Sequence, residues 1–320
     1  MPLGEFDVIA RYFSRATQRA DVLLGVGDDA ALLAPPPGQA LVAATDTLVE
    51  GRHFLAGTPP EAIGHQALAV NLSDLAAMGA EPAWALLSLS MPATDEIWIE
   101  GFARGLYVLA DQHGVAVVGG DTVRGPLVVT IEVLGFMPPS QALRRSGAAP
   151  GDVLFVSGWP GEAAAGLELL RSGAAKFDSE DRCVRRFLYA EPRLELGRAL
   201  RGRATAAMDV SDGLLGDLRK LLSASGVGAR LDLERLPVSA ALARHNDPRR
   251  CERHVLEGGD DYELLFTLPA TLVDSAGELA RYAGCELHRI GVITTGEGIV
   301  GVRGGTEASL AGTGHDHFSG

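Results

Sequence analysis

The sequence predicts a two-domain protein whose halves both mix strands and helices, an α/β or α+β architecture. Its 320 residues, 47% of them hydrophobic, exceed what one ordinary core accommodates. Apolar runs of strand length alternate with longer helical patterns in both halves. Residues 137–151, which are rich in Pro, Ser, Gly and Arg, interrupt this alternation. We therefore expect one domain over 1–140 and a second over 141–320.

The first half opens with apolar residues at helical spacing, among them Phe6, Ile9 and Phe13. A long apolar segment and an amphipathic one predict two further helices, and short apolar runs predict strands. Helices are expected at 4–19, 60–78 and 95–113. Strands are expected at 40–45, 84–91, 115–118 and 127–136. The first strand ends in a polar cluster around Asp46, and the third runs into Gly119-Gly120-Asp121.

The second half repeats the mixture of short apolar runs and helical patterns, so it also predicts an α/β or α+β unit. Strands are expected at 152–157, 206–210, 229–233, 262–268 and 285–293. Helices are expected at 161–171, 192–200, 211–225 and 270–283.

The composition excludes several classes of partner and location. With 41 acidic and 28 basic residues the formal charge is −13, and such a surface repels a nucleic-acid backbone. The three cysteines lie far apart without CxxC spacing, which argues against a disulfide framework or a zinc site. Glu5 and Asp7 stand where a signal peptide needs positive charge, and no apolar run reaches the roughly 18–20 residues that span a bilayer. We expect a soluble protein of the reducing cytoplasm with no membrane partner.

Aspartate-bearing turns, often flanked by glycine, recur along the chain. They are GVGDDAALL (Asp28, Asp29), ATDTLVEGRHF (Asp46), AVNLSDLAAMGA (Asn71, Asp74), VVGGDTVRG (Asp121), MDVSDGLLGDL (Asp209, Asp212) and EGGDDYELLF (Asp260, Asp261). A carboxylate near buried backbone is costly unless it is paired, and Mg²⁺, which prefers oxygen ligands, removes that cost. Glycines leave backbone amides open to an anion. The set indicates a site for a nucleotide with Mg²⁺.

Other signatures of nucleotide chemistry are missing from the sequence. It has no GxxxxGK[ST] loop, no kinase catalytic-loop or DFG pattern, and only two lysines, Lys176 and Lys220. A protein that handles ATP with this sequence therefore does so through metal and aspartate rather than through a lysine.

The motifs together resemble the thiamine-monophosphate kinase family, over almost the whole chain from Gly4 to Phe318. They are, in order, GEFDVIARYF, GVGDDAALL, TDTLVEGRHF, ALAVNLSDLAAMGAEPAWALLSL, GGDTVRGPL, ALRRSGAAPGD, MDVSDGLLGDL, GGDDYELLF and the closing DHF. The aspartate blocks also occur, in looser form, in a wider superfamily that includes aminoimidazole ribonucleotide synthetase, selenophosphate synthetase and a hydrogenase-maturation protein. The opening and closing segments point to the kinase.

The resemblance implies a two-domain fold like that of aminoimidazole ribonucleotide synthetase. In this fold the N-terminal domain forms a barrel across a homodimer, and ATP and several Mg²⁺ ions lie in the cleft beside the C-terminal α/β domain. It also implies ATP-dependent phosphorylation of thiamine monophosphate to thiamine diphosphate, the last step of making that cofactor.

Site residues are carried over from the family motif by motif. By this resemblance Asp29, Asp46, Asp74, Asp121 and Asp209 bind magnesium with the help of Thr45, and Asp212 holds a further ion. Gly120, Asp121, Arg145 and Ser211 contact ATP, Tyr107 packs against the nucleotide, and His53 and Asp260 face the thiamine substrate. The sequence departs from the family at two positions. Asp260 stands where glutamate is frequent, and His315 stands where an aromatic residue commonly stacks on the substrate.

The expected mechanism needs no general base. A substrate phosphate oxygen is largely ionised near neutral pH, since its second pKa is about 6. Transfer then requires charge neutralisation and in-line positioning, which magnesium held by aspartates supplies. We expect direct transfer without a phosphoenzyme.

Structural interpretations of the same residues remain open. Asp28 can serve a turn, Asn71 can bond to backbone, and Asp212 can simply favour the start of a helix. Asp217 is expected to be solvated. Arg145 is either a surface charge or a phosphate ligand. The rival functions are another enzyme of the superfamily, or a metal- and nucleotide-binding protein without catalysis.

Overall fold

The computed structural model describes residues 3–17, 19–308 and 310, which form two compact units. The first unit runs to Leu75 and also contains Ala80–Ser140. The second unit contains Ala76–Gly79 and the described residues from Gln141 onward. In the part of the chain that is described, no helix combines the length and apolar character needed to cross a membrane.

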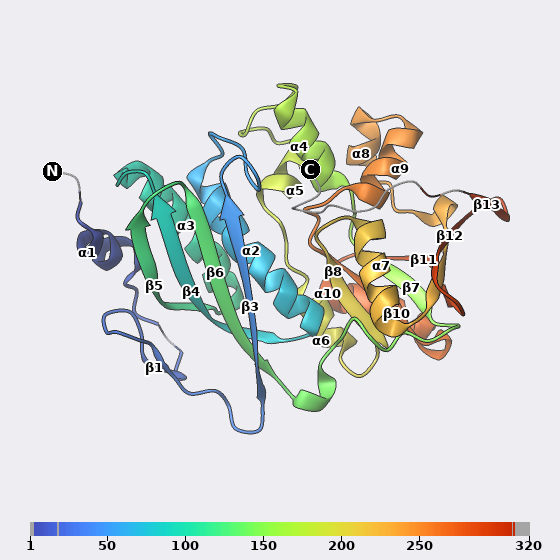
Figure 1. Ribbon diagram of the computed structural model, residues 1–320, viewed down its shortest axis with the longest axis horizontal. Coiled ribbons are helices and arrows are strands. Elements are labelled where there is room, and N and C mark those ends of the chain that lie inside the picture. Colours follow the sequence, from blue (N-terminus) through green and yellow to red (C-terminus); the bar gives the residue numbers. More distant parts are fainter. Residues whose placement is uncertain (1–2, 18, 309, 311–320) are drawn as a thin grey trace. The chain divides into compact units, whose positions relative to one another are not determined.

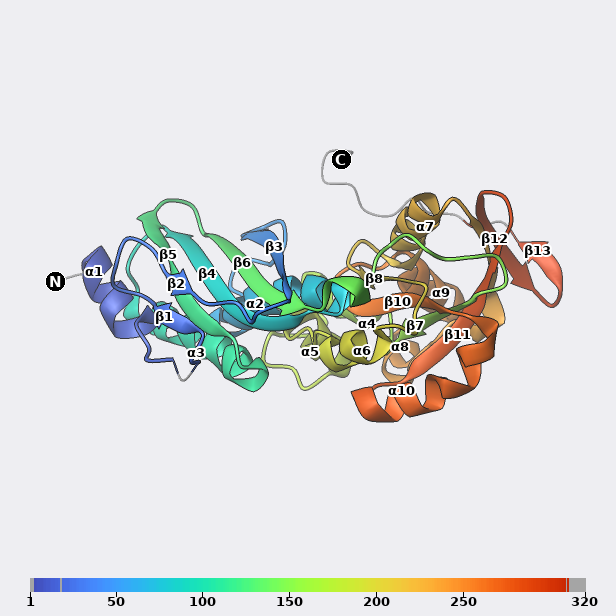
Figure 2. The same ribbon diagram turned by 90° about the horizontal axis from the view of Figure 1, so that it is seen from below.

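The first unit is built on a four-stranded sheet with the order β3-β6-β4-β5. Its strands are β3 (Ala40–Val49), β4 (Glu81–Met91), β5 (Ala116–Arg124) and β6 (Val128–Met137). The β3–β6 and β6–β4 pairs are antiparallel, whereas β4 and β5 are parallel. Helices α2 (Pro60–Met78) and α3 (Glu96–His113) cover one face of this sheet (Figure 2). The sheet therefore has one helix-covered face.

Glycines set the approach of α2 and α3. A Cβ on Gly105 of α3 would lie 1.9 Å from the carbonyl oxygen of Glu61, and one on Gly64 of α2 would lie 2.1 Å from that of Phe102. Both distances are far below van der Waals contact, so only glycine lets these helix backbones meet. The side chain of Asp95 caps the start of α3 by accepting bonds from the amides of Ile97 and Trp98.

Several elements of the first unit differ from the expected ones. The opening helix ends at Phe13, because α1 (Glu5–Val8) passes into a π-helical turn (Ile9–Phe13) and Ser14 is extended. Strand β3 continues to Val49, since its ladder with β6 is unbroken from Ala40 to Val49. A two-stranded sheet of β1 (Val22–Leu24) and β2 (Leu32–Leu33) was not expected.

The extension of β3 and β5 changes where two motifs lie. Asp46 is inside β3 rather than at its end, and Gly120 and Asp121 are inside β5. The expectation that these motifs follow the strands is wrong. Pairing with β6 and β4, which are distant in sequence, extends both strands through their polar residues.

The second unit contains a seven-stranded sheet with the order β13-β12-β9-β11-β7-β10-β8. Its elements take the later colours of the chain, from light green to red, in Figure 1. Its strands are β7 (Val153–Ser157), β8 (Ala206–Val210), β9 (Gly228–Asp232), β10 (Glu263–Leu268), β11 (Leu287–Thr294), β12 (Gly298–Arg303) and β13 (Thr306–Ala308). All pairs are antiparallel except β12 with β9. Its helices are α4 (Glu162–Arg171), α5 (Arg182–Leu188), α6 (Leu194–Leu200), α7 (Leu214–Ser225), α8 (Ala240–His245), α9 (Pro248–Glu257) and α10 (Ala276–Ala283). Short 3₁₀ turns lie at Pro139–Gln141, Leu233–Arg235 and Ala270–Ser275.

The core of the second unit packs α7 against the sheet. Leu214, Leu218 and Leu221 of α7 are fully buried beside Met208 of β8 and Leu265 of β10. Helices α5, α8 and α9 and strands β12 and β13 were not expected. The helix expected at 211–225 begins only at Leu214, after Gly213, whose φ is +101°. Asp212 therefore does not open it.

We predict that Gly105→Ala lowers the free energy of unfolding by about 2–3 kcal/mol, because the added methyl group must push α2 and α3 apart. Chemical denaturation measures the change. Gly277→Ala is the matched control, since Gly277 also lies within a helix but a Cβ there meets nothing within 4 Å. Its stability should stay the same or rise by a few tenths of a kcal/mol. Equal stabilities of the two variants would contradict the packing argument.

Candidate functional site

A cavity of about 780 Å³ in the first unit is lined by three of the expected site residues and by Asp28. Asp28 and Asp29 border it from the loop between β1 and β2, and Gly120 and Asp121 border it from β5. Its apolar part comes from the opening helix, β4 and β5. The cavity is therefore lined by carboxylates, by glycine backbone and by apolar side chains.

Gly120 is needed for the shape of this hollow. Its φ is +148°, and a Cβ there would lie 1.8 Å from the carbonyl oxygen of Leu87 on β4. Only glycine therefore allows β5 to lie against β4 at this point. The neighbouring Asp121 is exposed, as is Asp29. The Asp28 carboxylate accepts a bond of 2.9 Å from the amide of Asp29, so Asp28 serves the turn as well as the cavity wall.

A second group of expected residues surrounds β3. Asp46 is exposed, and its amide donates to the side-chain oxygen of Asn71 on α2 (2.9 Å). The Asn71 amide group donates in turn to the carbonyl of Ala67 (2.9 Å). Asn71 thus binds backbone on both sides and fixes the strand at Asp46, which favours its structural interpretation. Asp74 lies nearly one turn further along α2 and is half-buried.

Thr45 precedes Asp46 on β3, and His53 follows it in the chain, after the end of the strand. The Thr45 hydroxyl donates to the carbonyl of Ile131 on β6 (3.1 Å). His53 follows β3 in a turn, and its Nδ1 accepts a bond from the amide of Val49 (3.0 Å). A neutral His53 that accepts through Nδ1 carries its proton on Nε2. This leaves the Nε2–H as the group with which it donates.

The sheet separates the two groups within one chain. Asp46 on β3 pairs with Ile131 on β6, which pairs with Leu87 on β4, which pairs with Gly120 on β5. Three strand spacings place Asp46 about 14 Å from Gly120 and its neighbour Asp121. Among the described residues no group of three or more Asp, Glu, His or Cys side chains lies close enough to hold a metal ion.

Tyr107 is not among the residues that line the cavity beside Gly120. Its ring is 8% exposed, its hydroxyl donates to the carbonyl of Phe13 (3.0 Å), and the guanidinium of Arg15 stands 4.3 Å from the ring centre. Burial raises the pKa of Tyr107 to about 12. Tyr107 therefore offers little free surface to a nucleotide within this chain.

In the second unit, two loops bring the remaining expected residues together. Asp209 is the penultimate residue of β8, and Ser211 and Asp212 follow the strand. The loop before β10 lies beside them, because the Asp260 amide donates to the Ser211 carbonyl (2.9 Å) and the Tyr262 amide donates to the Val210 carbonyl (2.8 Å).

The loop before β10 has an uncommon backbone. Asp260 and Tyr262 have φ angles of +64° and +53°, a left-handed conformation that side chains rarely adopt. Such strain persists where the surroundings impose it, and it is frequent at functional sites. Here the two backbone bonds to Ser211 and Val210 impose it.

Asp217 organises the loop after β8, although the sequence had indicated a solvated side chain. It is fully buried, and its Oδ2 accepts bonds from the amides of Ser211 (2.9 Å) and Asp212 (3.0 Å). Burial raises the pKa of Asp217, against the bond from Lys220. The expectation failed because Asp217 lies in the first turn of α7, from which a side chain reaches back to the preceding loop. Ser211 is left with its hydroxyl as the group that can donate to a nucleotide.

Arg145 and His315 complete the expected set. The Arg145 side chain is exposed, and its carbonyl accepts a bond from the Ser225 hydroxyl (3.0 Å), which fixes the backbone at this position. His315 and the closing DHF segment lie outside the described residues.

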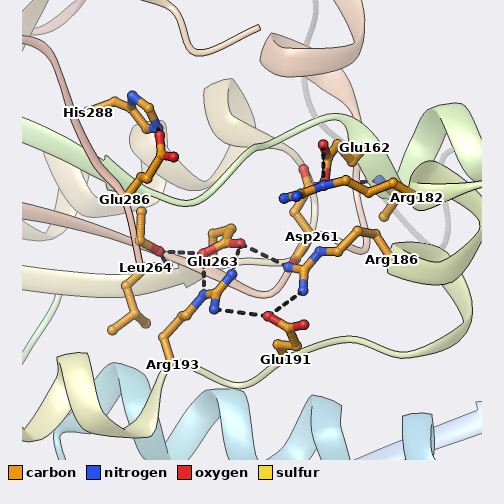
Figure 3. A network of polar contacts seen from close by, with 12 residues as sticks. Glu162, Arg182, Arg186, Glu191, Arg193, Asp261, Glu263, Leu264, Glu286 and His288 are labelled. Atoms are coloured by element: carbon orange, nitrogen blue, oxygen red, sulfur yellow. Dashed lines mark hydrogen bonds and ion pairs between the residues drawn. The ribbon is translucent and has the colours of Figure 1, made fainter. Parts of the chain in front are cut away.

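A buried charge network, which the sequence did not reveal, lies behind the loop before β10 (Figure 3). Glu263 is 1% exposed and accepts from Arg193 (2.6 Å to each oxygen), Arg186 (2.9 Å) and the Ser157 hydroxyl (2.6 Å). Glu191 bridges the two arginines at 3.1 Å from each. Burial alone would raise the pKa of Glu263, but the two guanidiniums outweigh it and lower the pKa to about 2. The one sign of this network in the sequence was a glutamate that begins the apolar run ELLF, where a buried charge needs a partner.

Asp261 links this network to the loop. It is 3% exposed, and its carboxylate accepts from the amides of Gly161 (2.7 Å) and Ala163 (3.4 Å) at the start of α4. Arg186 donates to the Asp261 carbonyl (3.4 Å). Burial raises the pKa of the Asp261 carboxyl well above its usual range. Asp261 therefore anchors the backbone beside Asp260.

Comparison with known proteins identifies the fold. The N-terminal domain model of AIR synthase related proteins matches residues 27–137, and the C-terminal domain model matches 149–303. Thiamine-monophosphate kinase of Escherichia coli (strain K12) is 46% identical over 323 residues, which cover 100% of this chain and 99% of that protein. The crystal structure of thiamine-monophosphate kinase from Stenotrophomonas maltophilia K279a is 46% identical with a TM-score of 0.88, and covers 93% of this chain and 96% of its own.

A third similarity concerns a complex. The structure of AaThiL complexed with AMPPCP and TMP is 32% identical with a TM-score of 0.77, and covers 88% of this chain and 89% of its own. The fold and the aspartate loops thus define a two-domain AIR synthase related protein, as expected from the sequence. Within that class, the chain belongs to the thiamine-monophosphate kinase family.

We predict that Glu263→Gln lowers the free energy of unfolding at pH 7 by about 3 kcal/mol, because it leaves two buried guanidiniums without their shared carboxylate. The pKa of Glu263 is about 2 in the folded protein against an ordinary 4.5. Its ionised form therefore stabilises the fold fully above pH 4.5, and this contribution is lost as the pH falls toward 2.

The pH dependence of chemical denaturation tests this prediction. Wild-type protein should lose stability between pH 4.5 and 2, and Glu263→Gln should lack that part of the loss. Glu180→Gln is the control, because Glu180 also pairs with an arginine but its side chain is 88% exposed. A Glu263→Gln profile parallel to that of the wild type would contradict the assignment.

Proposed function

We propose that the protein transfers the γ-phosphate of ATP to thiamine monophosphate, yielding thiamine diphosphate and ADP. The observation that carries the proposal is 46% identity to a thiamine-monophosphate kinase along the entire chain. The similarity to AaThiL complexed with AMPPCP and TMP supports ATP and thiamine monophosphate as the two substrates. The reaction completes thiamine diphosphate biosynthesis.

Magnesium fits the residues that the two units offer. The proposed ligands Asp29, Asp46, Asp74, Asp121, Asp209 and Asp212, with Thr45, present only hard oxygen donors. Asp29, Asp46 and Asp121 are exposed, so their carboxylates are accessible to an ion. Bound there, magnesium would supply charge neutralisation between two phosphate-bearing substrates.

The chain's own residues orient the substrates. We assign the phosphates of ATP to the open backbone at Gly120, to the hydroxyl of Ser211 and to the exposed guanidinium of Arg145, with Tyr107 near the nucleotide. His53, through Nε2–H, and Asp260 face the thiamine substrate, and His315 takes the stacking position. The acceptor phosphate oxygen is already ionised, so these residues orient and bind rather than remove a proton. We propose direct in-line transfer without a phosphoenzyme, because the ionised phosphate oxygen of the substrate is itself the nucleophile.

A homodimer completes the site in this proposal. Asp46 and Asp121 lie on opposite edge strands, about 14 Å apart, so one copy does not bring both to one ion. A barrel made from the four-stranded sheets of two copies would set Asp121 of one copy beside Asp46 of the other. Residues 1–140 then serve both dimerisation and ATP and magnesium binding. Three free cysteines and the use of ATP favour the cytoplasm as the compartment.

The first test is an assay of the purified protein with ATP, MgCl₂ and thiamine monophosphate, with products separated by chromatography. Thiamine diphosphate and ADP should appear in equal amounts. Asp46→Asn should reduce the rate by roughly 100-fold or more, because a metal ligand is lost. Asp178→Asn, the same change at an exposed carboxylate, should leave the rate unchanged. ATP hydrolysis without thiamine diphosphate would overturn the substrate assignment.

The dimer proposal predicts complementation between inactive variants. Asp46→Asn and Asp121→Asn should each be inactive alone. After subunit exchange, half of the dimers combine both variants and hold one intact site each, which restores about one quarter of wild-type activity. Size-exclusion chromatography with light scattering checks the dimer itself. A mixture that stays inactive despite proven exchange would show that each site uses residues of a single copy.

A further inference from the structure

Lys220 holds a positive charge between two carboxylates of the loop after β8. Its Nζ lies 2.5 Å from Asp212 Oδ2 and 2.8 Å from Asp217 Oδ1. The Asp217 side chain is fully buried, the Asp212 side chain is 28% exposed and that of Lys220 is 42% exposed. The ammonium therefore sits at the border between the buried Asp217 and the more open Asp212.

A lysine is unusual at this place in this chain. The sequence has only two lysines among 28 basic residues, and the other, Lys176, is exposed. An ammonium is a compact point charge that fits between two carboxylates, whereas a guanidinium is a planar fork. A lysine ammonium is ordinarily charged at neutral pH, and here it donates to both carboxylates.

We propose that Lys220 is a positioning residue that opposes binding of a divalent metal at Asp212 until nucleotide arrives. The inference rests on the proposed metal role of Asp212. In the free protein the ammonium occupies one oxygen of that carboxylate and repels a second cation beside it. Nucleotide phosphates add negative charge, which offsets this repulsion and lets metal enter with the substrate.

A purely structural role makes a different prediction. If Lys220 only neutralises the buried Asp217, its removal destabilises the loop that Asp217 holds at Ser211 and Asp212. A looser loop presents Asp212 less well, so metal affinity would fall or stay the same. The two roles therefore predict opposite directions for the same measurement.

The test measures Mn²⁺ binding to the full chain without nucleotide, by electron paramagnetic resonance of the free ion. Removing a unit charge about 5 Å from a divalent ion in a water-like dielectric should tighten binding about tenfold, so Lys220→Met should bind Mn²⁺ that much more tightly than wild type. Lys220→Arg keeps the charge and should stay near wild type. Lys176→Met removes the other, exposed lysine and should change nothing. Weaker or unchanged binding by Lys220→Met would overturn the inference.

The same substitution in an Asp212→Asn protein tests whether the tighter Mn²⁺ binding arises at Asp212. In Asp212→Asn protein, Lys220→Met should give no gain, because the competing carboxylate is gone; a gain that persists there would also overturn the inference. If Lys220→Met fails to fold, Lys220→Gln removes the same charge but keeps a polar side chain beside Asp217, and it should show the same tightening. The measurement contains no thiamine monophosphate, so a failed kinase assay leaves its result intact and the two proposals can fail separately.

Discussion

The cost of burying a carboxylate is the constraint on which the second unit depends. Asp217, Asp261 and Glu263 are each at most 3% exposed, and each is satisfied by the protein itself. Asp217 accepts hydrogen bonds from two backbone amides and an ammonium. Asp261 accepts them from amides at the start of α4, and Glu263 from two guanidiniums. Displacing Glu263 would leave two guanidiniums without their carboxylate, and displacing Asp217 or Asp261 would leave backbone amides unpaired, so each displacement is costly. These buried contacts therefore fix the two loops that carry the candidate site residues.

The sequence predicted most strands and helices because the spacing of apolar residues depends only on neighbouring positions in the chain. Strand β8 and the centres of α3 and α4 lie where apolar spacing placed them. Helix α9 was missed because it is mostly polar, although Asp247 followed by Pro248 is a recognisable helix start. The true ends of β3 and β5 depend on partners from distant parts of the chain, and local patterning does not contain that information.

The candidate site was predicted as a set of residues but not as an arrangement. Motifs identified Asp29, Asp46 and Asp121, yet only the strand order reveals that β6 and β4 separate Asp46 from Asp121. In the second unit the prediction was more complete, since neighbouring strands β8 and β10 bring Ser211 and Asp260 into contact. The residues that hold these loops were missed, because a buried ion pair resembles a surface charge in a sequence.

Exposure separates most of these aspartates into two kinds that the sequence treats alike, although Asp209 is a proposed ligand that is only 5% exposed. From the sequence, carboxylates near buried backbone were expected to need a metal to offset desolvation. The most deeply buried ones, Asp217 and Asp261, instead find amides and cations within the chain, whereas Asp29, Asp46 and Asp121 are exposed and lose little hydration. For the exposed set the force that favours magnesium is mutual repulsion among carboxylates and phosphates once substrates gather them. Metal binding should accordingly strengthen with nucleotide, and the role proposed for Lys220, between the buried Asp217 and the half-buried Asp212, acts in the same direction.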